Sequence, residues 1–165
     1  MNDQQILFEY LLRLADSDLL LAQRLGEWVG HGPVLEEDIA TTNVGLDLLG
    51  QSRLWFAYAG EVESRLNNGA RRSEDQLAFL RDAGEFRNLM LVEQPNGDYA
   101  LTMARQFYFD VWHELSLRGL TASTDARIAE IAAKALKEVR YHGERSADWV
   151  RTDPTGRRSL LRRGA

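Results

Sequence analysis

The stretch Val92-Glu93-Gln94-Pro95-Asn96-Gly97-Asp98-Tyr99-Ala100 divides this chain into two halves and starts the third long helix that the sequence predicts. Pro95 cannot continue a helix, and Asn96-Gly97 is typical of a turn. Asp98 can then accept hydrogen bonds from the free N–H groups of the turn that follows. We therefore expect a helix from about Asp98 to Leu120. Its sequence is apolar almost all round, which is typical of a buried helix.

One carboxylate interrupts this apolar helix. Asp110 stands among large hydrophobic side chains, which are Phe107, Tyr108, Phe109, Val111 and Trp112. Burying an acid without a partner is costly, so Asp110 needs a ligand or a hydrogen-bonding partner. We expect the other long helices to supply the groups that Asp110 faces.

Three further long helices follow from apolar residues at steps of three and four. They cover residues 5–29, 34–65 and 125–150, and a short helix with a Ser73/Gln76 capping box covers 73–80. Few residues join the first helix to the second or the third to the fourth, whereas some thirty separate the two pairs. Short joins make antiparallel hairpins and the long one is a crossover. The sequence thus predicts an all-α, ferritin-like four-helix bundle of two hairpins joined by a long crossover with a short helix.

Composition excludes several function classes. The chain has 165 residues, enough for one domain, and a formal net charge of −5, which argues against nucleic-acid and anionic-membrane partners. It has no cysteine, which excludes disulfides, iron–sulfur clusters and thiolate zinc sites. No stretch approaches the ~20 apolar residues of a membrane span, and the N-terminus does not resemble a signal peptide. We expect a cytoplasmic protein.

Each long helix is expected to turn one carboxylate inward, and a histidine joins the last of them. The set is Asp18, Asp47, Asp110, Glu138 and His142. Ferritin-like di-iron sites use a similar layout, with a Glu from each of two helices and Glu-x-x-His from each of the other two.

The set departs from that di-iron pattern. Gly50 lies three residues after Asp47, and Tyr141 lies three after Glu138, so both histidine positions are vacant. His142 is one residue too far along, about 100° around the helix. We therefore expect no metal and no cofactor, and a vestigial polar cluster in which the acids pair with His142, Tyr141 and one of Arg24, Arg53 or Arg105. A degenerate metal site that still binds metal is the alternative.

No other motif points to catalysis. His113-Glu114 could begin a metalloprotease motif, but Leu117 stands where that motif needs its second histidine. The sequence offers no convincing nucleophile or general base. The sequence therefore does not indicate an enzyme that catalyses a reaction on its own.

Several segments resemble a known family, the structural C subunits of phenylacetyl-CoA epoxidases. The resemblance covers about residues 5–150 and is most specific at Glu93-Gln94-Pro95-Asn96-Gly97-Asp98. Other matching segments are Glu27-Trp28, Leu35-Glu36-Glu37-Asp38-Ile39-Ala40, Leu46-Asp47-Leu48 with Gly50-Gln51, Leu80-Arg81-Asp82, Glu85-Phe86-Arg87-Asn88 and Lys137-Glu138-Val139-Arg140-Tyr141-His142.

The resemblance implies a ferritin-like protein that supports a homologous catalytic partner. That partner carries the di-iron centre and binds the CoA thioester, and the structural C subunits support it without iron. The resemblance thus implies a non-catalytic member of a hetero-oligomer, with a homodimer in isolation as a further expectation. The family continues with more helices, whereas here the similarity stops near Val150. We expect a bundle over 1–150 and a short basic tail over 151–165. Alternatives are a metal-binding oxidoreductase and a plain helical interaction module.

Overall fold

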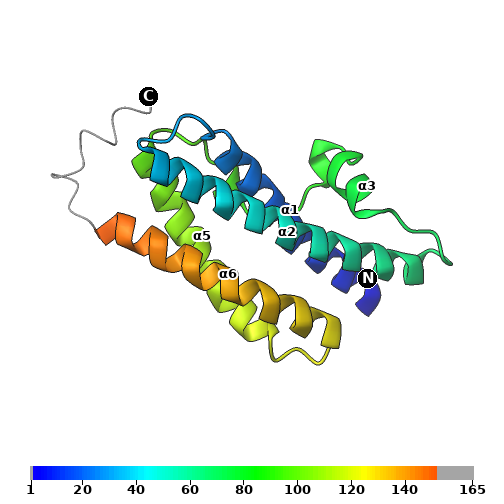
Figure 1. Ribbon diagram of the computed structural model, residues 1–165. Helices are drawn as coiled ribbons and strands as arrows, with labels where there is room; N and C mark the ends of the chain where they lie inside the picture. The colour runs from blue at the N-terminus through cyan, green and yellow to red at the C-terminus, as the bar shows by residue number, and fades with distance from the viewer. Residues whose placement is uncertain (1, 152–165) are drawn as a thin grey trace.

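The computed structural model describes residues 2–151, and all the regular elements of this range are helices (Figure 1). The four long helices are α1 (Asp3–Gly26), α2 (Leu35–Leu66), α5 (Tyr99–Leu120) and α6 (Ala126–Arg151). The connection between α2 and α5 holds α3 (Glu74–Phe79), the 3₁₀ turn η1 (Ala83–Glu85) and α4 (Met90–Glu93). None of the helices in this part of the chain is long and apolar enough to cross a membrane.

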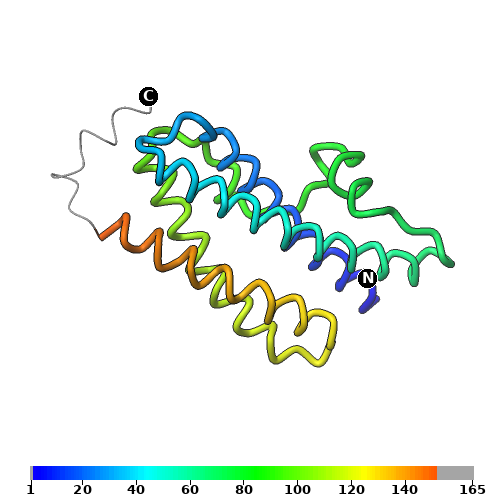
Figure 2. Tube along the Cα trace, viewed as in Figure 1, coloured from blue at the N-terminus to red at the C-terminus, as the bar shows by residue number. Residues whose placement is uncertain are grey.

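The topology confirms the predicted ferritin-like bundle. α1 and α2 form one antiparallel hairpin and α5 and α6 form the other, and the crossover containing α3 passes over the outside of the first hairpin (Figure 2). The predicted helix boundaries agree with the structure to within three residues. Ser73 and Gln76 form the expected capping box at the start of α3. Of the predicted basic tail, only Arg151 lies within the described residues, as the last residue of α6.

The turn before α5 is held by side chains on both sides of it. Asp98 caps α5 as predicted, because its side chain accepts from the backbone N–H of Leu101 at 2.8 Å. Gly97 adopts a φ of +59°, a region that favours glycine. The buried Arg105 donates to the Gln94 carbonyl at 2.8 Å and to Asn96 at 2.7 Å. The turn therefore sets both the start and the direction of α5.

A buried ion pair attaches the crossover to α1. The side chains of Asp16 and Arg81 are 0% and 1% exposed, and Arg81 donates to both carboxylate oxygens of Asp16. The backbone N–H of Arg87 donates to the same carboxylate at 2.8 Å. The Arg81 guanidinium also lies 4.4 Å from the ring centroid of Phe86. These contacts fix the crossover against the outer side of the first hairpin.

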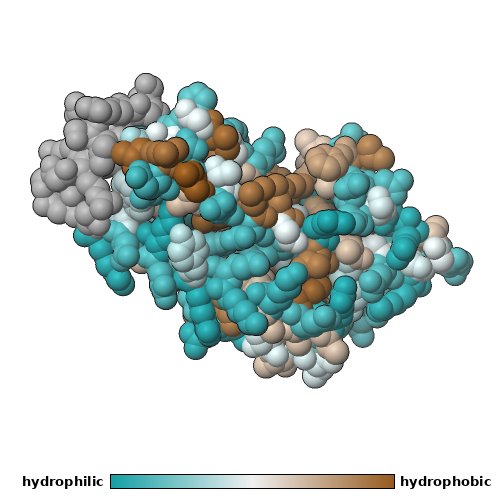
Figure 3. Space-filling model, in the orientation of Figure 1, coloured by the Kyte–Doolittle hydropathy of each residue, from teal (hydrophilic) through white to brown (hydrophobic). Residues whose placement is uncertain are grey.

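The prediction that α5 is buried all round is wrong. One side packs into the core through residues such as Phe109 and Leu117, but other large apolar side chains on the same helix are exposed. They are Leu101, Tyr108, Val111 and Leu115. Figure 3 shows apolar groups scattered over one face of the molecule, so exposed hydrophobic side chains are not confined to α5.

Candidate functional site

The four predicted carboxylates lie at two different depths. Asp18 on α1 and Asp110 on α5 are each 1% exposed. Asp47 on α2 and Glu138 on α6 are less buried, and the Asp47 side chain is 39% exposed. Two of the acids therefore lie deep in the bundle, while the other two lie at its edge.

Asp18 faces a histidine from outside the predicted cluster. Its Oδ1 lies 3.6 Å from Nε2 of His113, too far for a good hydrogen bond, and its Oδ2 has no hydrogen-bond partner among the described residues. Burial raises the pKa of Asp18 well above its usual value. Burial also lowers the pKa of His113 to about 3, and nearby His142 adds to this effect. At neutral pH His113 is therefore a neutral imidazole, and the two side chains do not form an ion pair.

Asp110 is held by two hydrogen-bond donors. Gln106, one turn earlier on α5, donates to Oδ1 at 2.7 Å, and the hydroxyl of Ser146 on α6 donates to Oδ2 at 2.7 Å. Burial raises the pKa of Asp110 to about 7, although these two hydrogen bonds and the charge of Arg145 oppose the rise. Asp110 thus joins α5 to α6 through neutral hydrogen-bond partners and carries only part of a charge at neutral pH.

The two outer acids each pair across the gap between α2 and α6. Nε2 of His142 lies 3.0 Å from Oδ2 of Asp47, and Gln51 donates to Glu138 at 2.8 Å. Burial lowers the pKa of His142, and Asp47 opposes this change. The neutral imidazole therefore donates its Nε2–H to the Asp47 carboxylate.

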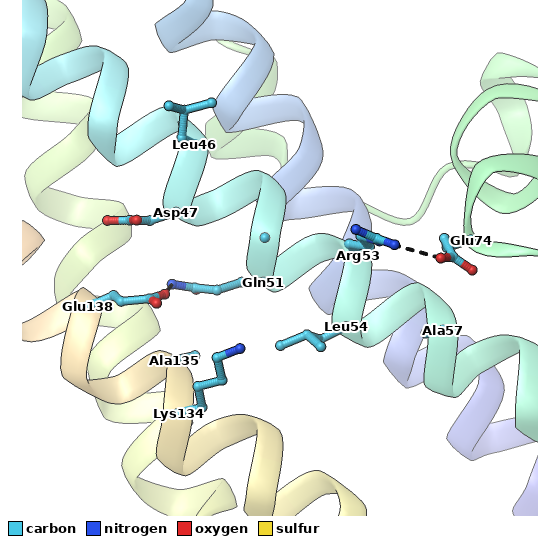
Figure 4. Close-up of a pocket in the computed structure, with 11 residues that line it drawn as sticks. Leu46, Asp47, Gln51, Arg53, Leu54, Ala57, Glu74, Lys134, Ala135 and Glu138 are labelled. Atoms are coloured by element: carbon cyan, nitrogen blue, oxygen red, sulfur yellow. Dashed lines mark hydrogen bonds and ion pairs between the residues drawn. The ribbon is translucent and has the colours of Figure 1, made fainter.

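A pocket of about 450 Å³ opens between α2 and α6 beside these two pairs. Figure 4 shows Gln51 reaching from α2 toward Glu138, with Lys134 on the α6 side of the opening. Gln51 is buried, and its Oε1 accepts no hydrogen bond from the residues that the structure describes. Gly50 also lines the pocket, and a Cβ at this position would meet no atom within 4 Å. The pocket is therefore open where the di-iron pattern would place an imidazole.

Of the five predicted residues, Asp47 and His142 pair with each other, whereas Asp18, Asp110 and Glu138 contact residues outside the set. Within residues 2–151, no group of three or more His, Asp or Glu side chains is arranged so that it could hold a metal ion. A di-iron centre of the ferritin-like kind needs six protein ligands gathered around two metals. These side chains do not fit such a centre as they are arranged.

The arginines and the tyrosine that were expected beside the acids have other surroundings. Arg24 pairs with Glu27 at 3.2 Å, and Arg53 pairs with Glu74 at 3.4 Å. Arg105 donates to the turn before α5, and Tyr141 is 53% exposed. The raised pKa values of the two deep acids, Asp18 and Asp110, are therefore caused by burial, and these groups do not pair with either acid.

Four partners of the acids were not predicted from the sequence, although helical spacing marks two of them. His113 lies three residues after Asp110, and this spacing places two side chains on one helix face. Gln106 lies four residues before Asp110, a spacing at which Gln and Asp side chains hydrogen-bond on a helix. Gln51 and Ser146 contact acids on other helices, which local spacing does not indicate.

A second polar cluster ties α2, α5 and α6 together near the end of the bundle where α6 finishes. Arg145 donates to Glu37 at 2.6 Å and to the hydroxyls of Thr41 and Tyr99 at 3.0 Å each. Trp149 donates to the same Glu37 carboxylate at 2.8 Å. The cluster compensates the Glu37 charge internally and fixes the ends of three helices.

Comparison with known proteins relates this arrangement to one family. A family described as phenylacetic acid catabolic protein matches residues 1–160. The C subunit of the 1,2-phenylacetyl-CoA epoxidase of Escherichia coli (strain K12) is 51% identical over 141 residues. The aligned region covers 86% of this chain and 54% of the relative, so the chain spans about half the length of the curated protein it matches.

Proposed function

Because the chain belongs to the phenylacetic acid catabolic protein family, we propose that it is a non-catalytic structural subunit of a phenylacetyl-CoA epoxidase. In this role it supports a homologous catalytic partner, which carries the di-iron centre and converts the CoA thioester. The 51% identity to the C subunit of such an epoxidase supports the structural role over the catalytic one.

The observation that carries the non-catalytic role is the donor set at the centre of the bundle. The positions that would supply imidazole ligands hold Gly50 and the exposed Tyr141. The two buried histidines, His113 and His142, face acids in separate pairs. The raised pKa values of Asp18 and Asp110 also make these acids weaker ligands at neutral pH, because a ligand carboxylate must lose its proton. This set is suited to filling a bundle interior without metal.

The opposing function is a metal-dependent oxidoreductase that uses the same acids and His142. It requires the pairs to rearrange around iron, and it predicts tight, stoichiometric metal binding. The test is to incubate the purified chain with Fe(II) without oxygen, remove unbound metal by desalting and measure iron by elemental analysis. We expect well under one iron per chain, unchanged in Asp47→Asn. About two irons per chain, lost in that variant, would contradict the structural role.

Partnership is tested separately by co-expression with a tagged catalytic subunit of a phenylacetyl-CoA epoxidase. We expect the chain to co-purify in a fixed ratio and to increase the amount of soluble catalytic partner. A matched control is the same experiment with a ferritin-like bundle from outside the family. If the chain fails to co-purify although it is folded by circular dichroism, the proposed partnership is wrong.

A further inference from the structure

The chain contains two Asn-Gly dipeptides, Asn68-Gly69 and Asn96-Gly97, and the structure holds them differently. An asparagine followed by glycine is open to attack by the next backbone nitrogen, because glycine has no Cβ to hinder the approach. The attack needs a side-chain amide that can rotate and a following backbone N–H that can move. The contacts around each dipeptide therefore decide which of the two can react.

Three hydrogen bonds fix the side chain of Asn96. Its Nδ2 donates to the backbone carbonyl of Arg24 at 2.8 Å and to Oε2 of Glu27 at 2.7 Å. Its Oδ1 accepts from the guanidinium of the buried Arg105 at 2.7 Å. The amide must give up all three bonds before its Cγ can turn toward the next backbone nitrogen.

Asn68 lies in the turn that follows α2 and is exposed. Within residues 2–151, no group forms a hydrogen bond with its side-chain amide. Its φ of +51° is the left-handed conformation that ends many helices. The N–H of Gly69 donates to the carbonyl of Ser64 at 2.9 Å, and this bond must open before the nitrogen can attack. It is a single backbone bond at a helix end, where helices fray.

The space around the two glycines differs in the same sense. A Cβ built on Gly69 would meet no atom within 4 Å, whereas one built on Gly97 would lie 2.6 Å from Cδ2 of Leu101. The turn after α2 can therefore change its backbone conformation without a clash. The turn before α5 is packed against a side chain and cannot.

We propose that Asn68 is a site of spontaneous deamidation in the folded chain and that Asn96 is protected from the same reaction. The backbone nitrogen of Gly69 loses its proton and bonds to Cγ of Asn68, and the side-chain nitrogen leaves as ammonia. Water then opens the resulting five-membered imide at either carbonyl, which gives aspartate or isoaspartate. The net reaction exchanges an amide for a carboxyl group, consumes one water and needs no other reactant.

The product changes both the charge and the backbone where the crossover leaves α2. A carboxylate at position 68 lowers the formal net charge of −5 by one unit and lies beside the negative end of the helix dipole. Isoaspartate also lengthens the backbone by one carbon, so the bond from Gly69 to Ser64 cannot keep its geometry. The pair of Glu63 and Arg72 at 2.7 Å still holds the residues that follow, so we expect the bundle to stay folded. The inference does not depend on the proposed function.

The first test compares the two dipeptides within one sample. The purified chain is incubated at physiological temperature in mildly alkaline buffer, digested with trypsin at intervals and analysed by mass spectrometry. Cleavage after arginine places Asn68 in peptide 66–71 and Asn96 in peptide 88–105. We expect Asn68 to convert roughly 100-fold faster, because Asn96 must break two more hydrogen bonds and each is worth up to about tenfold. In guanidinium chloride, which unfolds the chain, the two sites should convert at similar rates.

Two variants test the cause of the difference, and circular dichroism checks that both are folded. Asn68→Gly keeps the left-handed turn and should abolish the change of charge seen by isoelectric focusing. Glu27→Ala removes one acceptor from the amide of Asn96 and should speed conversion there about fivefold, while Asn68 keeps its rate.

Equal rates at Asn68 and Asn96 in the folded chain would overturn the proposal. It also fails if Asn68 stays an amide for as long as the unfolded chain needs to react completely. An unchanged rate at Asn96 in Glu27→Ala would contradict the claim that its hydrogen bonds protect it.

Discussion

The Asp16→Ala variant should lose a large part of the stability of the bundle, because it removes the only acid that contacts the buried Arg81 guanidinium within the described residues. The Arg81 side chain is buried, so water cannot replace the lost carboxylate. Leaving one partner of a buried pair without the other costs roughly 3–5 kcal/mol. The backbone N–H of Arg87 also loses its acceptor, which adds about 1 kcal/mol. Domains of this kind are stable by only about 5–15 kcal/mol in total.

The measurement is a urea titration followed by far-ultraviolet circular dichroism. With a slope of about 2 kcal/mol per molar urea, a loss of about 4 kcal/mol lowers the midpoint by about 2 M. Glu130→Ala is the matched control, because it removes an acid from an exposed pair with Arg127 at 3.0 Å and should cost less than about 1 kcal/mol. The double variant Asp16→Leu/Arg81→Met should recover most of the loss, since it leaves no buried charge unpaired. A midpoint shift below about 0.5 M for Asp16→Ala, with an unchanged slope, would refute this reasoning.

Two further predictions concern the polar interior and the turn before α5. Asp110 has a folded pKa of about 7, above its unfolded value of 3.8, so its contribution to stability falls as pH rises from about 4 to 7. Asp110→Asn should remove that contribution, so that stability rises with pH between about 4 and 6.5 through the lowered pKa of His113, and the variant should be more stable than the parent at pH 8. Urea titrations at several pH values test this, and a parent-like pH dependence would contradict it. Gly97→Ala should lose about 1–2 kcal/mol because φ there is +59°. Gly119→Ala is the control: it lies in α5 with open space around the added carbon, so it should lose no stability. Equal thermal midpoints for the two variants would contradict the argument.

The sequence predicted the helices and their order because those depend on local signals. Pro95, Asn96-Gly97 and Asp98 each act on the few residues around them, and Asp98 caps α5 as expected. The length of the connection between the two hairpins then indicated a crossover, which is the connection that the ferritin-like bundle uses. The family resemblance rests on the same region and agrees with the matched family over residues 1–160.

The partners of the buried acids could not be predicted, because they depend on contacts between distant segments. Asp16 and Arg81 are 65 residues apart, and neither has a local pattern that marks it as buried. The apolar sequence of α5 also led to an overestimate of its burial, because it does not indicate which side of the helix packs against another helix. Because the whole helix was predicted to be buried, Leu101 and Tyr108 were expected in the core, but both side chains are exposed.

The deep titratable groups explain how this bundle can keep a polar interior. Burial raises the pKa values of Asp18 and Asp110 and lowers those of His113 and His142. Between about pH 4 and 6.5 the folded chain holds a proton on Asp110 that the unfolded chain releases, whereas the unfolded chain binds a proton at His113 that the folded chain excludes. The two effects oppose each other, so their contributions to the pH dependence of stability cancel in that range. His113→Asn should therefore unmask a loss of stability with rising pH in urea titrations, which a parent-like flat profile would contradict. Burial thus opposes charge on each of these four groups, which suits the supporting role that we propose.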